Sequence, residues 1–337
     1  MTQPAAFAVR KNHIMALPAS LTDRLSLPLI AAPMFLVSGP ALVIEACRNG
    51  VIGSFPTANC RTPEELENWL TRIAAACQTA PGAKIAPFCP NIIVHRSNPR
   101  VPADLALVIK HKAEMVIASV GSPEPIIGPL HDAGCLVFAD IASLRHAEKA
   151  IAVGVDGLVL LAAGAGGQTG WANPFAFVRA VRAIYDGPIV LAGGIADGTA
   201  LYAAQALGCD LAYMGTKFIA TRESMAVAAY KSMLVDARID DIKLTRAFTG
   251  LETNMLRQSI LAAGLDPDNL PARGAIDIAK DINAAERDKP DAKRWKNIWS
   301  AGHTVSGVAD IPSVAELVAR TKAEYDQARK AARALTA

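Results

Sequence analysis

Two glycine-bearing turns follow neighbouring apolar segments in the second half of the 337-residue chain. Gly193 and Gly194 come after the run PIVLA, and Gly215 and Thr216 come after LAYM. Glycine lets backbone N–H groups approach an anion closely, and the start of a following helix adds a favourable dipole. The alternative is a pair of ordinary turns between strand and helix. Because both turns fall after consecutive strands, the pattern favours a phosphate-binding site.

A glycine-rich segment, AGAGGQTG, spans residues 163–170 after another apolar run. Each glycine costs conformational entropy on folding, so this density indicates a loop whose backbone lies close to a ligand. The Gln168 amide can donate or accept a hydrogen bond toward that ligand. Trp171 either covers the ligand or packs behind the loop; the sequence favours neither.

A further polar cluster contains Asn91, at the end of an apolar run, and His95 just beyond it. His95 is a candidate acid or base, although a histidine beside Arg96 in a loop is more often solvated or structural. No spacing of histidines and carboxylates indicates a metal site, and no nucleophile elbow or Walker phosphate loop is present.

The elements that must position these residues alternate in type along the chain. Helix-length segments separate eight apolar runs of strand length, namely residues 27–33, 51–55, 84–92, 115–119, 135–139, 157–161, 188–192 and 211–215. Continuous apolar runs are typical of parallel strands buried on both faces, and eight of them predict a closed (β/α)8 barrel of the α/β class. A doubly wound open sheet is the alternative, but no G-x-G-x-x-G motif follows the first run. In a barrel, the turns described above share the C-terminal face.

Composition limits the class of protein. Hydrophobic residues make up 52% of the chain and the net charge is +3, which excludes a disordered chain and gives no sign of nucleic-acid binding. Prolines interrupt the uncharged stretch at 25–44, so we expect a strand, turn and helix there and no membrane span. The six cysteines form no C-x-x-C pair, and the N-terminus lacks a signal-peptide pattern. These features predict reduced thiols in a cytoplasmic protein.

The expected organisation has three parts. Residues 22–224 form the barrel, residues 225–297 form a helical lid after the eighth strand, and residues 298–337 close on the barrel. Apolar residues at helical spacing predict an amphipathic helix from Ser313 onward.

A phosphate site and a glycine-rich loop over one barrel mouth suit a phosphorylated cofactor. Pyridoxal phosphate fits less well, because it forms a Schiff base with a lysine and no lysine lies at a strand end. Lys217 lies past the turn, at the start of a helix. FMN fits better, with backbone amides facing its ring and its phosphate in the last two loops.

At these residues the sequence resembles the nitronate monooxygenase family, formerly called 2-nitropropane dioxygenases. The resemblance extends over LPLIAAPM, NIIVHRSNPR, AGAGGQTG, the long run PIVLAGGIADGTALYAAQALGCDLAYMGTKFIATRES and IWSAG. It implies an FMN-dependent oxidoreductase in which an alkyl nitronate is oxidised with O2 to a carbonyl compound and nitrite. The residues implied to hold FMN are Ala32, Pro33, Met34, Asn91, Gly166, Gly167, Gln168, Gly193, Gly194, Gly215 and Thr216.

The sequence departs from the family at two positions. Many members carry a histidine where this chain has Gln168, and that histidine is the expected base for a neutral nitroalkane. Glutamine cannot act as a base at neutral pH. We therefore expect activity on a nitronate, which is already deprotonated, to be retained more than activity on a neutral nitroalkane. Gln168 and His95 are the predicted catalytic residues. Asp140 stands where some relatives have a basic residue near the flavin.

Two other functions remain open at this stage. One is an FMN enzyme that uses NAD(P)H to reduce a quinone or an enoyl thioester. The other is a barrel that binds a phosphorylated ligand without redox chemistry. In each case the partner is a small molecule, and the sequence does not define an oligomeric state.

Overall fold

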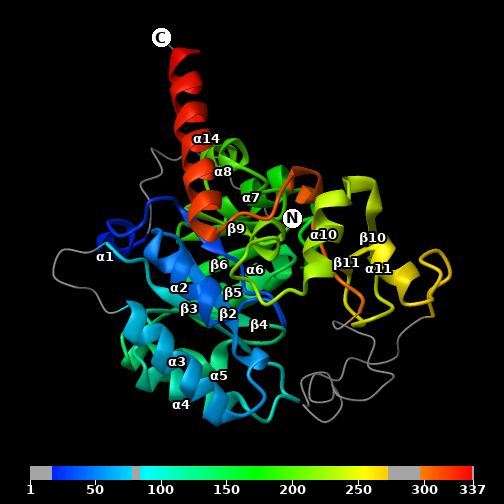
Figure 1. The fold of residues 1–337 in the computed structure, drawn as a ribbon. Helices are drawn as coiled ribbons and strands as arrows, with labels where there is room; N and C mark the ends of the chain where they lie inside the picture. The colour runs from blue at the N-terminus through cyan, green and yellow to red at the C-terminus, as the bar shows by residue number, and fades with distance from the viewer. Residues whose placement is uncertain (1–16, 78–83, 272–296, 336–337) are drawn as a thin grey trace, which may run out of the picture.

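The computed structural model describes residues 17–77, 84–271 and 297–335. Eight parallel strands close into a barrel, in which the last strand pairs with the first through Ile30 and Tyr213 (Figure 1). The predicted (β/α)8 fold is therefore confirmed. The barrel strands are β1 (Leu29–Ala31), β2 (Ile52–Pro56), β3 (Phe88–Ile93), β4 (Met115–Ser119), β5 (Leu136–Ile141), β6 (Gly157–Leu161), β8 (Ile189–Ala192) and β9 (Leu211–Met214).

Helices follow the strands and begin at the signals present in the sequence. Ser143, Asn173 and Asp197 accept hydrogen bonds from backbone N–H groups in the first turns of their helices, and proline opens several others. The helices of this part of the chain are α1 (Ala19–Thr22), α2 (Pro40–Arg48), α3 (Pro63–Cys77), α4 (Val101–Lys110), α5 (Glu124–Asp132), α6 (Leu144–Ala152), α7 (Pro174–Arg182), α8 (Gly198–Leu207) and α9 (Thr216–Ile219), with the short η1 (Thr57–Asn59).

Side chains that point into the barrel form a core separate from the one between strands and helices. Phe138 of β5 belongs to this inner core and is fully buried. A Cβ atom on Gly157 of β6 would lie 2.1 Å from the Phe138 ring, so only glycine fits beside it. The inner core fills the barrel below its C-terminal mouth and leaves the mouth free for a ligand.

The prediction that residues 225–297 are helical was wrong for part of the segment. It contains α10 (Ala228–Asp236), η2 (Ile239–Asp241), β10 (Ile242–Thr245), β11 (Thr253–Leu256) and α11 (Arg257–Ala262), grouped at one side of the barrel in Figure 1. The two strands pair antiparallel, and β11 also pairs with β7 (Gly167–Gln168) from the glycine-rich loop. The extended conformation of β11 is favourable because its backbone can pair with the edge of β7. Residues 272–296 of the expected lid lie outside the described part of the chain.

The end of the chain returns to the barrel through η3 (His303–Gly307) and α14 (Val314–Ala334). Ser313 and Glu316 form a capping box at the start of α14, and the helix packs against α8 and α2. The expected C-terminal helix is present, and its far end projects beyond the barrel (Figure 1).

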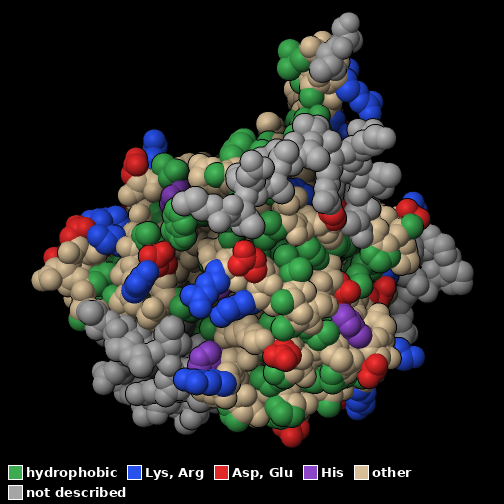
Figure 2. All heavy atoms as spheres, turned by 180° about the vertical axis from the view of Figure 1, so that it is seen from behind, with side chains coloured by type: hydrophobic (Ala, Val, Ile, Leu, Met, Phe, Trp, Pro, Cys, Tyr) green, Lys and Arg blue, Asp and Glu red, His purple; other side chains and the backbone are tan. Residues whose placement is uncertain are grey.

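Acidic and basic side chains are interspersed over the face of the molecule shown in Figure 2. Among the described residues, no helix is both long and apolar enough to cross a membrane. None of the six cysteines forms a disulfide, and Cys77 alone of the six is not buried.

Candidate active site

A cavity of about 470 Å³ opens at the C-terminal ends of the barrel strands. This volume suits a cofactor or other small molecule. The eleven residues expected to contact a cofactor all line this one cavity: Ala32, Pro33, Met34, Asn91, Gly166, Gly167, Gln168, Gly193, Gly194, Gly215 and Thr216. The two glycine turns therefore lie at the same end of the barrel, after the neighbouring strands β8 and β9.

The glycine turns line the cavity and carry backbone N–H groups without a backbone acceptor among the described residues. The N–H groups of Gly193, Gly194 and Gly215 donate no hydrogen bond to the backbone of another described residue. Gly193 and Gly194 have φ values of 113° and 81°, which side-chain-bearing residues rarely adopt. A Cβ on Gly194 would meet no atom within 4 Å, because it would point into open space. Backbone N–H groups without a described backbone acceptor, on glycines that line the cavity, can form a site for an anion such as a phosphate.

Thr216 follows these donors at the start of α9. Its side chain is buried, and its Oγ1 accepts a hydrogen bond from the N–H of Gly302 at 2.9 Å. An accepting hydroxyl keeps its own proton, so Thr216 can also donate to an anion.

The glycine-rich loop packs closely against the segment that leads into η3. A Cβ on Gly166 would lie 2.7 Å from the backbone nitrogen of Gly302, and the N–H of His303 donates to the carbonyl of Gly164 at 2.9 Å. Asn254 of β11 donates to the carbonyl of Ala165 at 2.7 Å. Close contact between two backbone segments therefore accounts for part of the glycine density, which the sequence analysis assigned to a ligand alone.

The loop after β1 is shaped by Asn59, which the sequence analysis did not identify. Its Nδ2 donates to the carbonyls of Met34 and Ser38 at 3.1 and 2.8 Å, and its Oδ1 accepts from the N–H of Leu36 at 2.8 Å. Leu36 has a φ of 59°, an uncommon value for a leucine. These bonds fix the wall of the cavity that carries Pro33 and Met34.

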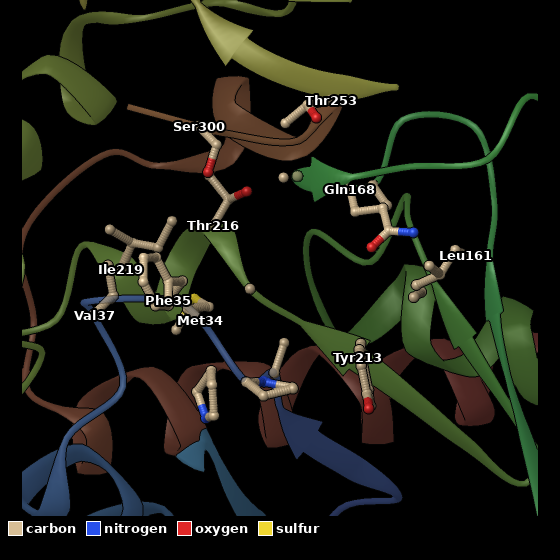
Figure 3. A pocket seen from close by; sticks show the side chains of 18 of the residues that line it. Met34, Phe35, Val37, Leu161, Gln168, Tyr213, Thr216, Ile219, Thr253 and Ser300 are labelled. Atoms are coloured by element: carbon tan, nitrogen blue, oxygen red, sulfur yellow. The ribbon is translucent and has the colours of Figure 1, made fainter. Parts of the chain in front are cut away.

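Gln168 extends from β7 into the cavity, with its amide at the opposite side from Met34 and Phe35 (Figure 3). Its backbone is fixed by the pairing of Gln168 with Thr253 of β11. The side-chain amide makes no hydrogen bond to another described residue and is free to contact a ligand with its donor or its acceptor.

The floor of the cavity is polar. Asn91 donates to the carbonyl of Ile117 and to Ser119 Oγ, both at 3.1 Å. Asp140 and Tyr213 also line the floor, and Asp140 Oδ1 and the Tyr213 hydroxyl are buried without a hydrogen-bond partner among the described residues. Burial raises the pKa of Asp140 to about 7. It also raises the pKa of Tyr213, and the nearby Asp140 carboxyl raises it further.

The wall above the floor comes from chain that follows the barrel. Tyr230 stacks on Trp299 with ring centroids 5.0 Å apart, and its hydroxyl donates to the carbonyl of Ser300. These three residues line the cavity together with Thr253. The sequence analysis did not propose them, and its available signal was the run IWSAG that contributed to the family resemblance.

Two residues considered from the sequence lie elsewhere. The His95 Nδ1 atom lies 2.8 Å from Ser97 Oγ in the loop after β3, and His95 is not part of the cavity lining. Trp171 has 78% of its surface exposed and is not part of the lining either. It neither covers the cavity nor packs behind the loop.

The residues present fit a flavin nucleotide. Glycines with N–H groups that have no described backbone acceptor line one part of the cavity, and these groups could bind a phosphate. The unpartnered polar atoms of the floor can meet a polar ring edge. Within the described lining, Asp140, Tyr213 and Tyr230 are the titratable residues, and no lysine, arginine or histidine is among them. The described residues contain no group of three His, Cys, Asp or Glu side chains able to hold a metal ion. The fold and the cavity thus define a (β/α)8 barrel with a small-molecule site at its C-terminal mouth.

Comparison with known proteins specifies the family. The family model described as nitronate monooxygenase matches residues 19–324. The chain is 28% identical to a nitronate monooxygenase of Paraburkholderia phytofirmans, over 89% of this chain and 92% of the relative. It is 26% identical, over 84% of this chain and 76% of the relative, to a hydroxy-methyl-oxo-octahydro-indene-carboxyl-CoA dehydrogenase of Rhodococcus jostii. A solved nitroalkane oxidase from Streptomyces ansochromogenes superposes with a TM-score of 0.77 at 25% identity, over 93% and 99% of the two chains.

This chain belongs to the nitronate monooxygenase family and is a flavin-dependent oxidoreductase.

Proposed function

We propose that the protein binds FMN in the cavity at the barrel mouth and oxidises alkyl nitronates with O2 to a carbonyl compound and nitrite. The single observation that favours a nitronate is the absence of a histidine or lysine base from the described lining of the cavity. Gln168 occupies the place where many family members carry histidine, and the described lining contains no histidine or lysine. A nitronate arrives deprotonated and needs no base.

Different parts of the cavity would bind the phosphate and the ring of the cofactor. The N–H groups of Gly193, Gly194 and Gly215 and the hydroxyl of Thr216 would hold the phosphate. The backbone of Gly166 and Gly167 and the loop at Ala32, Pro33 and Met34 would line the ring. FMN held there would supply the redox chemistry that links oxidation of the substrate to reduction of O2.

Gln168 would position the substrate. Its unpaired side-chain N–H can donate to a nitronate oxygen, and this bond orients the carbon toward the cofactor without moving a proton. The stacked rings of Tyr230 and Trp299 form an apolar wall that excludes water from that space. His95 stays a predicted acid or base from the sequence, although its position outside the lining gives it no direct route to the substrate.

A second candidate is an FMN enzyme that exchanges electrons between NAD(P)H and a quinone, an enoyl thioester or a related acyl-CoA. The similarity to the Rhodococcus jostii acyl-CoA dehydrogenase, over most of this chain, favours it. A pocket whose described lining has no histidine or lysine also suits a substrate that is already electrophilic.

The experiment that tests both candidates uses the purified full-length protein. An absorbance spectrum identifies the flavin, and extraction followed by chromatography distinguishes FMN from FAD. Nitronate-dependent O2 uptake with release of nitrite supports the first function. Rapid anaerobic bleaching of the flavin by NADH or NADPH, together with slow bleaching by nitronates, supports the second. A colourless protein that takes up no FMN on titration rejects both.

A further inference from the structure

Asp140 is a carboxyl group without a role in the proposed function. It is the second-last residue of β5 and lies on the same face of the strand as Phe138, which points into the barrel. The residue is partly exposed to the cavity, but its Oδ1 atom is fully buried and has no hydrogen-bond partner among the described residues. A buried carboxylate without partners is costly, so this atom indicates either protonation or a missing ligand contact.

The groups around Asp140 do not balance a negative charge. The titratable neighbours that influence the floor are Tyr213 on β9 and Cys89 on β3, and each is neutral because burial raises its pKa. Asn91 and Ser119 bond to each other across β3 and β4. On the other side, β6 contributes apolar side chains to the inner core, and no cation is among the described lining residues.

A flat ring that settles on this floor changes the surroundings of Asp140. In the open cavity, water reaches part of the residue and supports its charged form. A ring that displaces this water leaves the carboxylate with no counter-charge, and the neutral acid becomes the stable form. A neutral carboxyl is also a hydrogen-bond donor, which the acceptor atoms at the edge of a flavin ring can use.

We propose that Asp140 takes up one proton from solvent when the flavin ring binds, and that the resulting carboxylic acid donates a hydrogen bond to a polar atom of the ring. This inference rests on the proposed flavin site. It makes Asp140 the group that selects an uncharged, acceptor-bearing ring at the floor. Its pKa, about 7 before the ring binds, makes the uptake measurable at ordinary pH.

The test is isothermal titration calorimetry of the flavin-free protein with riboflavin. Riboflavin carries the ring without the phosphate, so the ligand itself exchanges no proton between about pH 6 and about pH 9. Titration in buffers with different ionisation enthalpies gives the number of protons taken up. We expect uptake that approaches one proton near pH 8, and an affinity that falls toward tenfold for each pH unit above about 7. FMN is measured in the same way.

Two variants separate Asp140 from its surroundings. Asp140→Asn keeps the shape of the side chain and should remove both the proton uptake and the loss of riboflavin affinity with pH. Tyr213→Phe removes the other unpartnered polar atom of the floor and should leave both in place. For FMN, subtraction of the Asp140→Asn values cancels the proton exchange of the phosphate.

The outcomes are distinct. Wild-type protein that binds riboflavin without proton uptake overturns the inference and leaves the proposed flavin site intact. Uptake that persists in Asp140→Asn or disappears in Tyr213→Phe also overturns it. Protein that binds neither riboflavin nor FMN overturns the proposed function and the inference together.

Discussion

Replacement of Asp140 by asparagine should stabilise the flavin-free protein at high pH. An aspartate in an unfolded chain ionises near its ordinary pKa of 3.8, whereas burial in the folded protein raises the pKa of Asp140 to about 7. Between these values the folded protein holds a proton that the unfolded chain has released. The free energy of unfolding therefore falls as pH rises from about 4 to about 7, and the cost stays constant above pH 7. Asparagine does not ionise and does not carry this cost.

The size of the effect follows from the two pKa values. A difference of about three pH units corresponds to about 4 kcal/mol, at about 1.4 kcal/mol for each unit. Because the cavity admits water to part of the residue, we expect about 2–4 kcal/mol at pH 8 and less than about 1 kcal/mol near pH 4. With an unfolding entropy of about 2.1 cal/mol/K for each of 337 residues, this raises the Tm at pH 8 by about 3–6 °C.

The assay is thermal unfolding of flavin-free protein, followed by circular dichroism across this pH range. Asp210→Asn is the control with the opposite sign. The fully buried Asp210 carboxylate accepts a hydrogen bond from Arg182 Nη2 at 2.6 Å, and loss of its charge should lower the Tm at pH 8. A Tm difference between the Asp140→Asn and wild-type proteins that does not change with pH would refute the reasoning.

Two further predictions concern the cofactor and the substrate. Gly194→Asp should abolish FMN retention, because it directs a carboxylate into open space beside the phosphate donors. Gly154→Asp is the control: Gly154 has a similar φ of 89° and equally open space, but it lies outside the cavity. This variant should keep the flavin content of the wild type. Equal flavin content in the two purified variants would show that the phosphate lies elsewhere. Gln168→His should raise activity on neutral nitroalkanes relative to nitronates at least several-fold, measured as O2 uptake, since it restores a base; an unchanged ratio would contradict the missing-base argument.

The barrel could be predicted from sequence because its signals are local. A strand such as Gly157–Leu161 is buried on both faces and reads as an uninterrupted apolar run, and a cap such as Asp197 marks the helix that follows. Topology then determines which turns share a face. The strand ends that carry Gly193 and Gly215 had to meet once the barrel closed, so the position of the cavity followed from the order of the elements.

The errors arose where structure depends on distant partners. Thr253–Leu256 reads as a polar segment, and it is extended because β7 offers a free edge to it. Gly166 is required by contact with Gly302, more than 130 residues away, which no local pattern reports. The inward direction of Asp140 could have been predicted from the sequence, because Asp140 lies two residues from Phe138 on the same strand face. Its lack of a partner was not, because that depends on side chains from several other strands.

The charge balance of the cavity connects these observations. FMN brings a phosphate that is negative at neutral pH, and the described lining meets it with backbone N–H groups and a hydroxyl, without a cation. An ionised Asp140 would add a second negative group to the same low-dielectric space, where repulsion between charges is much stronger than in water. The phosphate and the carboxylate therefore oppose each other through the cavity, and protonation of Asp140 relieves the repulsion at the lowest cost. The absence of a basic residue from the described lining thus links the two proposals, because an anion held at the mouth would favour a neutral acid at the floor.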